Sequence, residues 1–310
     1  MSIPVHTLPA SPLRVAVAQA PLVPLDIAAN TATAAALVRR AAAQGARLLL
    51  LSELFLTGYE TAGIAADPDT LTVAPDDPRL APLAAACAGT GTAVVVGAPV
   101  RDRDTGTLHI AALALDGSGR TAAVYRKQFA TPNERAAGFS PGTGGCTLEL
   151  DGWRLGIGVC WDSGFPEHAR AAALDGAHAY LVGALFGTGP GAHQRRTVFP
   201  ARALDNTLYV LLANHVGRSG PYTGCGLSAA WGPDGHLLAE AAEDAPELLT
   251  VDLDPAVLAR ARTDDPVLLQ PGLTTTPTRT TATLSTTGGA GSCAMGKRAT
   301  AHITAQPEPS

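Results

Sequence analysis

The chain has 310 residues and a mass of 31.5 kDa, which is near the upper limit for one hydrophobic core. A hydrophobic content of 46% is enough to fill such a core, and it excludes a mostly disordered chain. The formal net charge of -5 lacks the excess of basic residues on which nucleic-acid binding depends. The sequence therefore predicts a globular protein that does not bind nucleic acid.

The five cysteines stand at wide, irregular spacings, and none belongs to a Cys-x-x-Cys pair. An odd number without such pairs argues against a disulfide framework and against a structural zinc site. No apolar stretch approaches the roughly 18 residues of a membrane span. The short apolar run at 15–20 lacks the basic segment that precedes the core of a signal peptide. We therefore expect a cytoplasmic protein without a metal ion and without a membrane partner.

Strand and helix patterns alternate along the first two thirds of the chain. Apolar runs of strand length occupy 13–18, 48–51, 94–96, 109–115, 121–125, 147–150, 154–159, 180–182, 207–213, 227–231 and 237–241. Helical patterns occupy 26–44, 77–89, 166–175 and 194–206. The uninterrupted leucines at 48–51 are typical of a strand buried on both faces. This alternation predicts one α/β domain, with a mixed sheet covered by helices.

The composition changes near residue 272. Thr-Thr-Thr, Thr-Thr and Gly-Gly runs of small polar residues replace the apolar pattern from there on. We expect a folded domain at 1–271 and an extension at 272–310 that is flexible or becomes ordered only against a second subunit.

Lysine is rare in this chain. Only Lys127 and Lys297 are lysines among 22 basic residues, and Lys297 lies in the extension. A single lysine in the folded domain indicates a site that requires a compact ammonium group rather than a planar guanidinium. A surface lysine left by chance is the alternative, and composition alone does not separate the two.

Two further residues stand where chemistry is expected. Cys160 follows an apolar strand and precedes a helix that starts at Pro166, so it would lie exposed at the end of the sheet near backbone N–H groups that can bind an oxyanion. Cys87, inside an Ala-rich helix, fits a buried structural cysteine instead. Glu53 ends an apolar strand, where partial burial would raise its pKa and suit it to proton transfer. By itself, Glu53 could equally be an exposed acid at a strand end.

Taken together, these segments resemble the nitrilase superfamily of carbon–nitrogen hydrolases. In that family a Glu, a Lys and a Cys occur in this chain order, and they match Glu53, Lys127 and Cys160. Glu134 stands where the family places a second active-site glutamate. The resemblance covers about residues 13–262 and does not include the extension.

The resemblance implies a four-layer αββα subunit that pairs through its helices into a homodimer or a larger homo-oligomer, and chemistry without a cofactor. It implies that Glu53 takes the proton of the Cys160 thiol and that the thiolate attacks a carbonyl or nitrile carbon. Lys127 and the Trp161 backbone N–H would then stabilise the oxyanion, while Glu134 orients Lys127.

The resemblance leads us to expect a hydrolase acting on a small amide or an N-carbamoyl amine. Asp follows the Cys-Trp pair, as in the amidase branches, whereas true nitrilases commonly have Glu at that position. The low aromatic content of 5% indicates a modest substrate pocket. We expect its walls to include Tyr59, Trp161 and Phe186.

Other functions stay open at this point. A nitrilase that converts a nitrile to an acid is the first alternative, and a binding protein that keeps the fold without turnover is the second. A papain-like Cys–His pair is also possible by composition, because His168, His193 and His215 are available. A serine hydrolase is disfavoured because the chain has no Gly-x-Ser-x-Gly motif, and a zinc hydrolase because it has no His-Glu-x-x-His motif.

Overall fold

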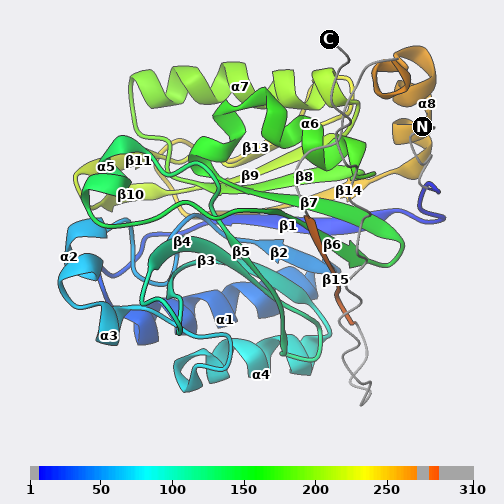
Figure 1. Ribbon diagram of the computed structural model, residues 1–310. Coiled ribbons are helices and arrows are strands. Elements are labelled where there is room, and N and C mark those ends of the chain that lie inside the picture. The colour runs from blue at the N-terminus through cyan, green and yellow to red at the C-terminus, as the bar shows by residue number, and fades with distance from the viewer. Residues whose placement is uncertain (1–6, 271–278, 286–310) are drawn as a thin grey trace, which may run out of the picture.

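Two mixed β-sheets pack face to face, and a layer of helices covers the outer face of each (Figure 1). The computed structural model describes residues 7–270 and 279–285. The first sheet has six strands, in the order β14 (Glu247–Leu253), β1 (Leu13–Gln19), β2 (Leu48–Leu50), β3 (Ala93–Arg101), β4 (Leu108–Leu115) and β5 (Thr121–Arg126). The second has seven, in the order β13 (Leu237–Glu240), β12 (Ala229–Trp231), β9 (Tyr209–Asn214), β8 (Ala179–Ala184), β7 (Trp153–Val159), β6 (Gly145–Leu150) and β15 (Arg279–Thr283).

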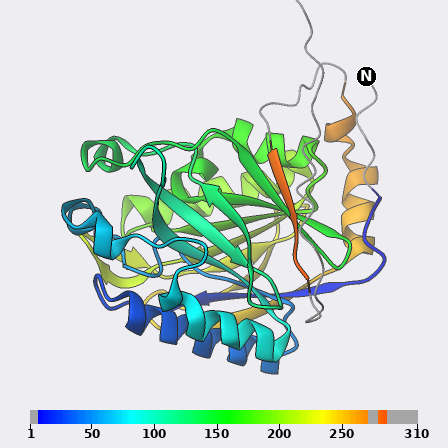
Figure 2. The ribbon, with the colours of Figure 1, turned by 60° about the horizontal axis from the view of Figure 1, so that its bottom comes forward.

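Long helices form the two outer layers, and shorter ones lie at the ends of strands. The outer layers consist of α1 (Ile27–Ala43) and α4 (Ala81–Thr90) on the first sheet and α6 (Pro166–Leu174) and α7 (Pro190–Asn206) on the second. A further helix, α8 (Pro255–Asp264), lies beside the sandwich (Figure 2) and inserts Leu258 into the core between the sheets. The short ones are α2 (Thr61–Ala66), α3 (Pro68–Leu71), α5 (Pro132–Ala136) and the 3₁₀ turns η1 (Pro78–Leu80), η2 (Cys160–Gly164) and η3 (Val267–Leu269). A separate hairpin joins β10 (Val216–Ser219) to β11 (Tyr222–Cys225). The predicted αββα sandwich is therefore confirmed.

The strand at 48–50 shows how this sequence encodes two cores. Because side chains alternate along a strand, Leu48 and Leu50 enter the core between the sheets, whereas Leu49 and Leu51 enter the core under α1 and α4. All four are at most 1% exposed. The uninterrupted leucine run thus marks a strand that is covered on both faces, as the sequence predicts.

Local signals place most of the elements correctly. The Asp26 carboxylate caps α1 by accepting from the Ala29 amide, and Gly45 (φ 79°) follows the helix in the left-handed conformation. The helix predicted at 77–89 is divided, because Asp77 and Pro78 start the 3₁₀ turn η1 and α4 begins only at Ala81. No helix in the described ranges is long and apolar enough to cross a membrane.

Part of the predicted extension belongs to the second sheet. β15 runs parallel to β6 at the edge of that sheet (orange in Figure 2). The Arg279 guanidinium lies near Gly145, where a Cβ would meet it at 2.2 Å, and it pairs with the Asp175 carboxylate at 3.2 Å. Leu284, one residue beyond the strand, is 3% exposed. Residues 279–285 thus pack on their own subunit, which differs from the expected flexible or subunit-contacting arm, while 271–278 and 286–310 lie outside the described residues.

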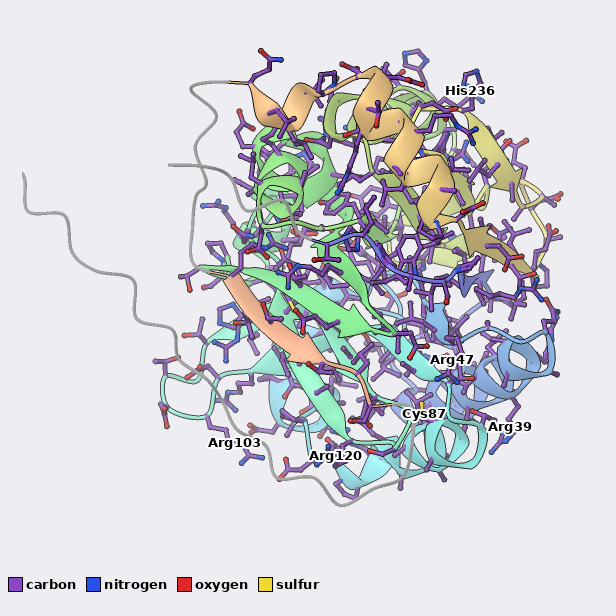
Figure 3. All side chains as sticks on the ribbon, turned by 90° about the vertical axis from the view of Figure 1, so that its right-hand side faces the viewer. Arg39, Arg47, Cys87, Arg103, Arg120 and His236 are labelled. Carbon is purple, nitrogen blue, oxygen red and sulfur yellow. The ribbon has the colours of Figure 1, made fainter. Side chains whose placement is uncertain are left out.

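Cys87 occupies the place expected of a structural cysteine. It lies on α4 in the outer core and is fully buried (Figure 3). Burial raises the pKa of its thiol to about 12, which keeps it unreactive at neutral pH.

The segment that follows β2 passes between the two sheets at very close range. A Cβ at Gly97, in β3, would lie 2.2 Å from the Ser52 carbonyl oxygen, and a Cβ at Gly183, in β8, would lie 2.6 Å from the Leu51 carbonyl oxygen. Only glycine permits this approach at either position. Two glycines, one from each sheet, therefore determine where the chain at Ser52 and Glu53 lies.

We predict that Gly97→Ala lowers the free energy of unfolding by about 1–3 kcal/mol, because the added methyl group collides with backbone that cannot move aside. Gly89→Ala is the matched control. A Cβ there meets nothing within 4 Å, and inside α4 the change should raise stability by up to about 1 kcal/mol. Denaturant unfolding of both variants measures the difference, and equal stabilities would contradict this account.

Candidate active site

Three strand ends and one short helix bring the predicted site residues together. Glu53 lies three residues beyond β2, Lys127 follows β5 directly, and Cys160 follows β7 directly. β5 runs in the same direction as β2, because β2 and β3 are parallel and β3, β4 and β5 are successively antiparallel. Glu134 comes from α5, which lies at the same end of the sandwich as the β10–β11 hairpin (Figure 1).

The Lys127 ammonium group lies between two carboxylates. Its Nζ is 2.7 Å from Glu53 Oε1 and 2.6 Å from Glu134 Oε1, and all three side chains are at most 1% exposed. Burial by itself would lower the pKa of Lys127, but attraction to Glu53, to Cys160 when it is ionised at high pH and to Glu134 outweighs burial and raises the pKa above its ordinary value. The lysine is therefore a buried, permanently charged cation. The alternative of a surface lysine is wrong.

Only one of the two carboxylate oxygens of Glu53 takes part in this ion pair. Its Oε2 is buried and has no hydrogen-bond partner within the described residues. Burial raises the pKa of Glu53 to about 7, with Lys127 opposing the rise and Glu134 adding to it. Such a carboxyl group can take up and release a proton at neutral pH, which is what a general base must do. The alternative of an exposed acid is excluded by its 0% exposure.

Glu134 is held in place by its own helix terminus and by a tyrosine. Its Oε2 accepts from the Thr131 amide at 2.7 Å, and the Thr131 hydroxyl accepts from the Glu134 amide, which is a capping box. The Tyr59 hydroxyl donates to Glu134 Oε1, the same oxygen that Lys127 contacts. Glu134 thus holds the lysine ammonium through a second ion pair, in addition to the one with Glu53.

Cys160 lies at the strand-to-helix turn that the sequence predicts. Its φ of 46° is rare for a residue with a side chain, and such strain is concentrated at functional sites. Its Sγ is 3.7 Å from the Leu185 carbonyl oxygen. Burial raises the pKa of the thiol well above its ordinary value, Glu53 and Glu134 add to the rise, and Lys127 opposes it. The resting side chain is therefore a neutral thiol that needs a base.

The three expected pocket residues lie in different surroundings. Tyr59 contacts Glu134 directly, and its ring meets that of Tyr222 edge to face at 5.7 Å. Trp161 directly follows Cys160 and packs against Phe165. The Phe186 ring instead packs on Phe199 in the outer core of the second sheet, so its expected role as a pocket wall stays a prediction.

The candidate histidines do not pair with the cysteine thiol. His215 hydrogen-bonds the Glu53 backbone carbonyl through Nε2, and burial lowers its pKa to about 4, so it is a neutral donor. His168 contacts the hydroxyls of Tyr125 and Tyr180. These bonds disfavour the papain-like alternative, and they show that His215 holds the segment that carries Glu53.

Sequence reasoning missed the β10–β11 hairpin and the residues that it brings to the site. The Ser219 hydroxyl accepts from the Tyr59 amide at 2.7 Å, and the Tyr222 hydroxyl accepts from the Asn133 side chain at 3.2 Å. The hairpin thus connects the Tyr59 segment to α5. These contacts join residues 160 and 89 positions apart, and no local pattern predicts them. Among the described residues, no cluster of His, Cys, Asp or Glu is arranged to hold a metal ion.

Comparison with known proteins identifies the family of this chain. The carbon–nitrogen hydrolase family matches residues 14–263, which is most of the chain. The chain belongs to the carbon–nitrogen hydrolase family. A hydrolase in the pqqF 5′ region of Pseudomonas protegens is 36% identical over 257 residues, which cover 81% of this chain and 86% of that protein. N-carbamoylputrescine amidase of Arabidopsis thaliana is 29% identical, with 74% of this chain and 82% of the relative covered.

Solved structures of an amidase lie close to this fold. A cysteine-to-alanine mutant of the amidase from Nesterenkonia sp. AN1, in complex with butyramide, superposes with a TM-score of 0.72 at 32% identity, covering 83% of this chain and 97% of that one. Another mutant of that amidase carries the acetamide moiety of fluoroacetamide at its active-site cysteine, with a TM-score of 0.71 and 32% identity. This carbon–nitrogen hydrolase is therefore an enzyme of the nitrilase superfamily, in its amidase-like branch.

We predict that Lys127→Arg loses about a hundred- to a thousandfold in kcat, the usual effect of losing one preorganised oxyanion donor. A guanidinium is wider than an ammonium, and Lys127 is only 1% exposed between two carboxylates, so the charge would lie farther from the reacting oxygen. Steady-state kinetics with circular dichroism as the folding check measure this. Arg126→Lys, next to it but exposed, is the control and should keep wild-type kcat. An active Lys127→Arg enzyme would exclude a role for the ammonium.

We also predict that kcat/KM falls as the pH drops below about 7. Glu53 has a raised pKa of about 7, so below that pH it becomes protonated and can no longer act as a base. Lys127 and Cys160 have raised pKa values and keep their protons above neutrality, so no matching loss is expected there. A pH profile of kcat/KM tests this. An acid limb near the ordinary carboxyl range of about 4 would contradict the assignment.

Proposed function

We propose that this carbon–nitrogen hydrolase cleaves the C–N bond of a small amide or an N-carbamoyl amine through a thioester on Cys160, without a cofactor. The observation that carries the proposal is the buried Glu53–Lys127–Glu134 arrangement beside a neutral thiol. It supplies a base, a fixed cation and a nucleophile in one place, and these are the groups that acyl transfer requires.

In the first half of the reaction, Glu53 takes the thiol proton while Sγ of Cys160 attacks the carbonyl carbon. The oxyanion that develops is stabilised by Lys127 and by the Trp161 backbone N–H. When the tetrahedral adduct collapses, the C–N bond breaks and the proton on Glu53 passes to the leaving nitrogen. Ammonia or an amine departs, and the acyl group stays on sulfur.

In the second half, a water molecule replaces the leaving group. Glu53, now ionised again, takes a proton from this water as its oxygen attacks the thioester carbon. Lys127 stabilises the second oxyanion, the C–S bond breaks, and the acid leaves as the proton on Glu53 returns to the thiolate. Glu134 takes no proton in this scheme and instead holds Lys127 and the Tyr59 hydroxyl.

Tyr59, Trp161 and Phe186 are proposed to contact the substrate. The support is strongest for Tyr59, which touches Glu134, and for Trp161, which follows the nucleophile. A nitrile is the alternative substrate, since the relatives include a nitrilase of Pyrococcus abyssi that is 29% identical over 76% of this chain. A binding protein without turnover is disfavoured by the intact arrangement of base, cation and thiol.

We propose a homodimer or a larger homo-oligomer, which pairs through the α6–α7 layer. The support is an exposed apolar surface on α7 and β13, where Leu204, Leu237 and Leu238 are each about half exposed. A cytoplasmic location is proposed because Cys87, Cys146, Cys160 and Cys225 are all free thiols, as a reducing compartment keeps them.

We predict that Cys160→Ala reduces ammonia release from small amides by on the order of 10⁶-fold, because no other group supplies the nucleophile. Cys87→Ala is the matched control and should alter only packing and stability. Ammonia release is measured over a panel of aliphatic amides, N-carbamoyl amines and nitriles. Turnover of nitriles alone would replace the amidase proposal with the nitrilase alternative, and turnover by Cys160→Ala would refute the thioester.

A further inference from the structure

Asp162 is a fully buried carboxylate that the proposed chemistry does not use. Its Oδ2 accepts from the Val159 amide at 2.9 Å and from the Tyr125 hydroxyl at 2.7 Å, and its Oδ1 accepts from the Phe129 amide at 2.9 Å. The side chain is 0% exposed. A buried carboxylate needs such a set of donors, because an unpaired one would be very costly.

The three donors come from the two segments that carry the reacting groups. Val159 immediately precedes Cys160, whereas Tyr125 and Phe129 lie two residues before and two residues after Lys127. The Lys127 segment follows β5 of the first sheet, and the Cys160 segment follows β7 of the second. One carboxylate therefore joins the two sheets at the point where the nucleophile and the cation must meet.

A chain of hydrogen bonds leads to this carboxylate, and the donor and acceptor of each bond are determined. Because the Tyr125 hydroxyl donates its proton to Asp162, its oxygen accepts from Nε2 of His168 at 2.8 Å. Nδ1 of His168 then accepts from the Tyr180 hydroxyl, also at 2.8 Å. Burial lowers the pKa of His168, in keeping with a neutral ring that has its proton on Nε2. Every donor in the chain thus points toward Asp162.

We infer that Asp162 is a positioning residue for this enzyme: it holds the Cys160 turn in register with Lys127, and the Tyr180–His168–Tyr125 chain orients its donors. The inference rests on the proposed function, since it concerns the same nucleophile and cation. Asp162 itself contacts none of the reacting atoms. Its effect lies in the placement of Sγ relative to the ammonium group, and a misplacement of about 1 Å can cost a hundredfold in rate.

The carboxylate form is required because all three partners are donors. An asparagine has a single acceptor oxygen, and its NH₂ group is a donor. That NH₂ group would face another donor, either the N–H of Phe129 or the N–H of Val159 and the hydroxyl of Tyr125. The fit around the chain is also close. A Cβ at Gly158, beside Val159, would lie 2.2 Å from the Tyr180 hydroxyl oxygen. Asp162→Asn therefore breaks the connection between the segments while changing the volume very little.

Tyr125→Phe and Asp162→Asn are the test variants, and Tyr209→Phe is the matched control. The Tyr209 hydroxyl likewise makes two hydrogen bonds, because it donates to the Asp254 carbonyl oxygen and accepts from the Asp254 amide. It lies away from the site. All three variants should be less stable than the wild type. If Asp162→Asn does not fold, Tyr125→Phe alone provides the test. Only the two site variants should lose about 10- to 100-fold in kcat with KM nearly unchanged.

Two readouts remain informative even if no amide is turned over. The rate of Cys160 alkylation by iodoacetamide should fall in Tyr125→Phe and stay at the wild-type value in Tyr209→Phe. In the full-length enzyme, ¹⁵N NMR should find His168 neutral with its proton on Nε2. Wild-type kcat and alkylation in Tyr125→Phe, or a proton on Nδ1 of His168, would overturn the inference. Absence of amide turnover together with the expected alkylation pattern would overturn only the proposed function.

Discussion

The buried contact of the Lys127 ammonium with Glu53 and Glu134 is the interaction on which the rest of the site depends. Taking an ammonium and two carboxylates out of water costs several kcal/mol per ion, and their mutual attraction offsets this only when the geometry is good. The structure meets that condition with contacts of 2.6 and 2.7 Å. It leaves one excess negative charge beside Cys160, and this charge helps to raise the pKa of the thiol. In the proposed mechanism the nucleophile therefore stays protonated until Glu53 accepts the proton, which couples thiolate formation to the attack.

Much of the fold positions these three charges. Gly97 and Gly183, one in each sheet, leave room for the chain at Ser52, and His215 holds the Glu53 carbonyl from the second sheet. Glu134 is fixed by its capping box, so its position depends on a helix terminus rather than on a long flexible loop. The two sheets thus meet at the site with backbone and hydrogen-bond constraints on each charged side chain. Catalytic groups that are held in this way need little reorganisation when charge develops.

Local patterns in the sequence predicted the features that depend on residues close together in the chain, namely secondary structure and motifs. Apolar periodicity located most strands and the helices α1, α4, α6 and α7, but it missed β14 and α8. Motif order singled out Glu53, Lys127, Cys160 and Glu134 as candidate site residues. Contacts between distant segments were not predictable in this way. The hydrogen bond from His215 to Glu53 joins residues 162 positions apart, and the edge strand β15 pairs with a strand more than 130 positions earlier. Asp162 drew notice only as the residue after the Cys-Trp pair, because its role arises from partners that the fold brings together.

In the proposed reaction the acyl group passes through Cys160, and mass spectrometry can detect this intermediate. The wild-type enzyme is mixed with a slowly hydrolysed amide, quenched with acid during turnover and digested for peptide mapping. The Cys160 peptide should show a transient mass gain, equal to the acyl group in place of the thiol hydrogen, that disappears as the substrate is consumed. A mass gain on any other residue, or hydrolysis that continues after iodoacetamide has blocked Cys160, would contradict the proposed reaction.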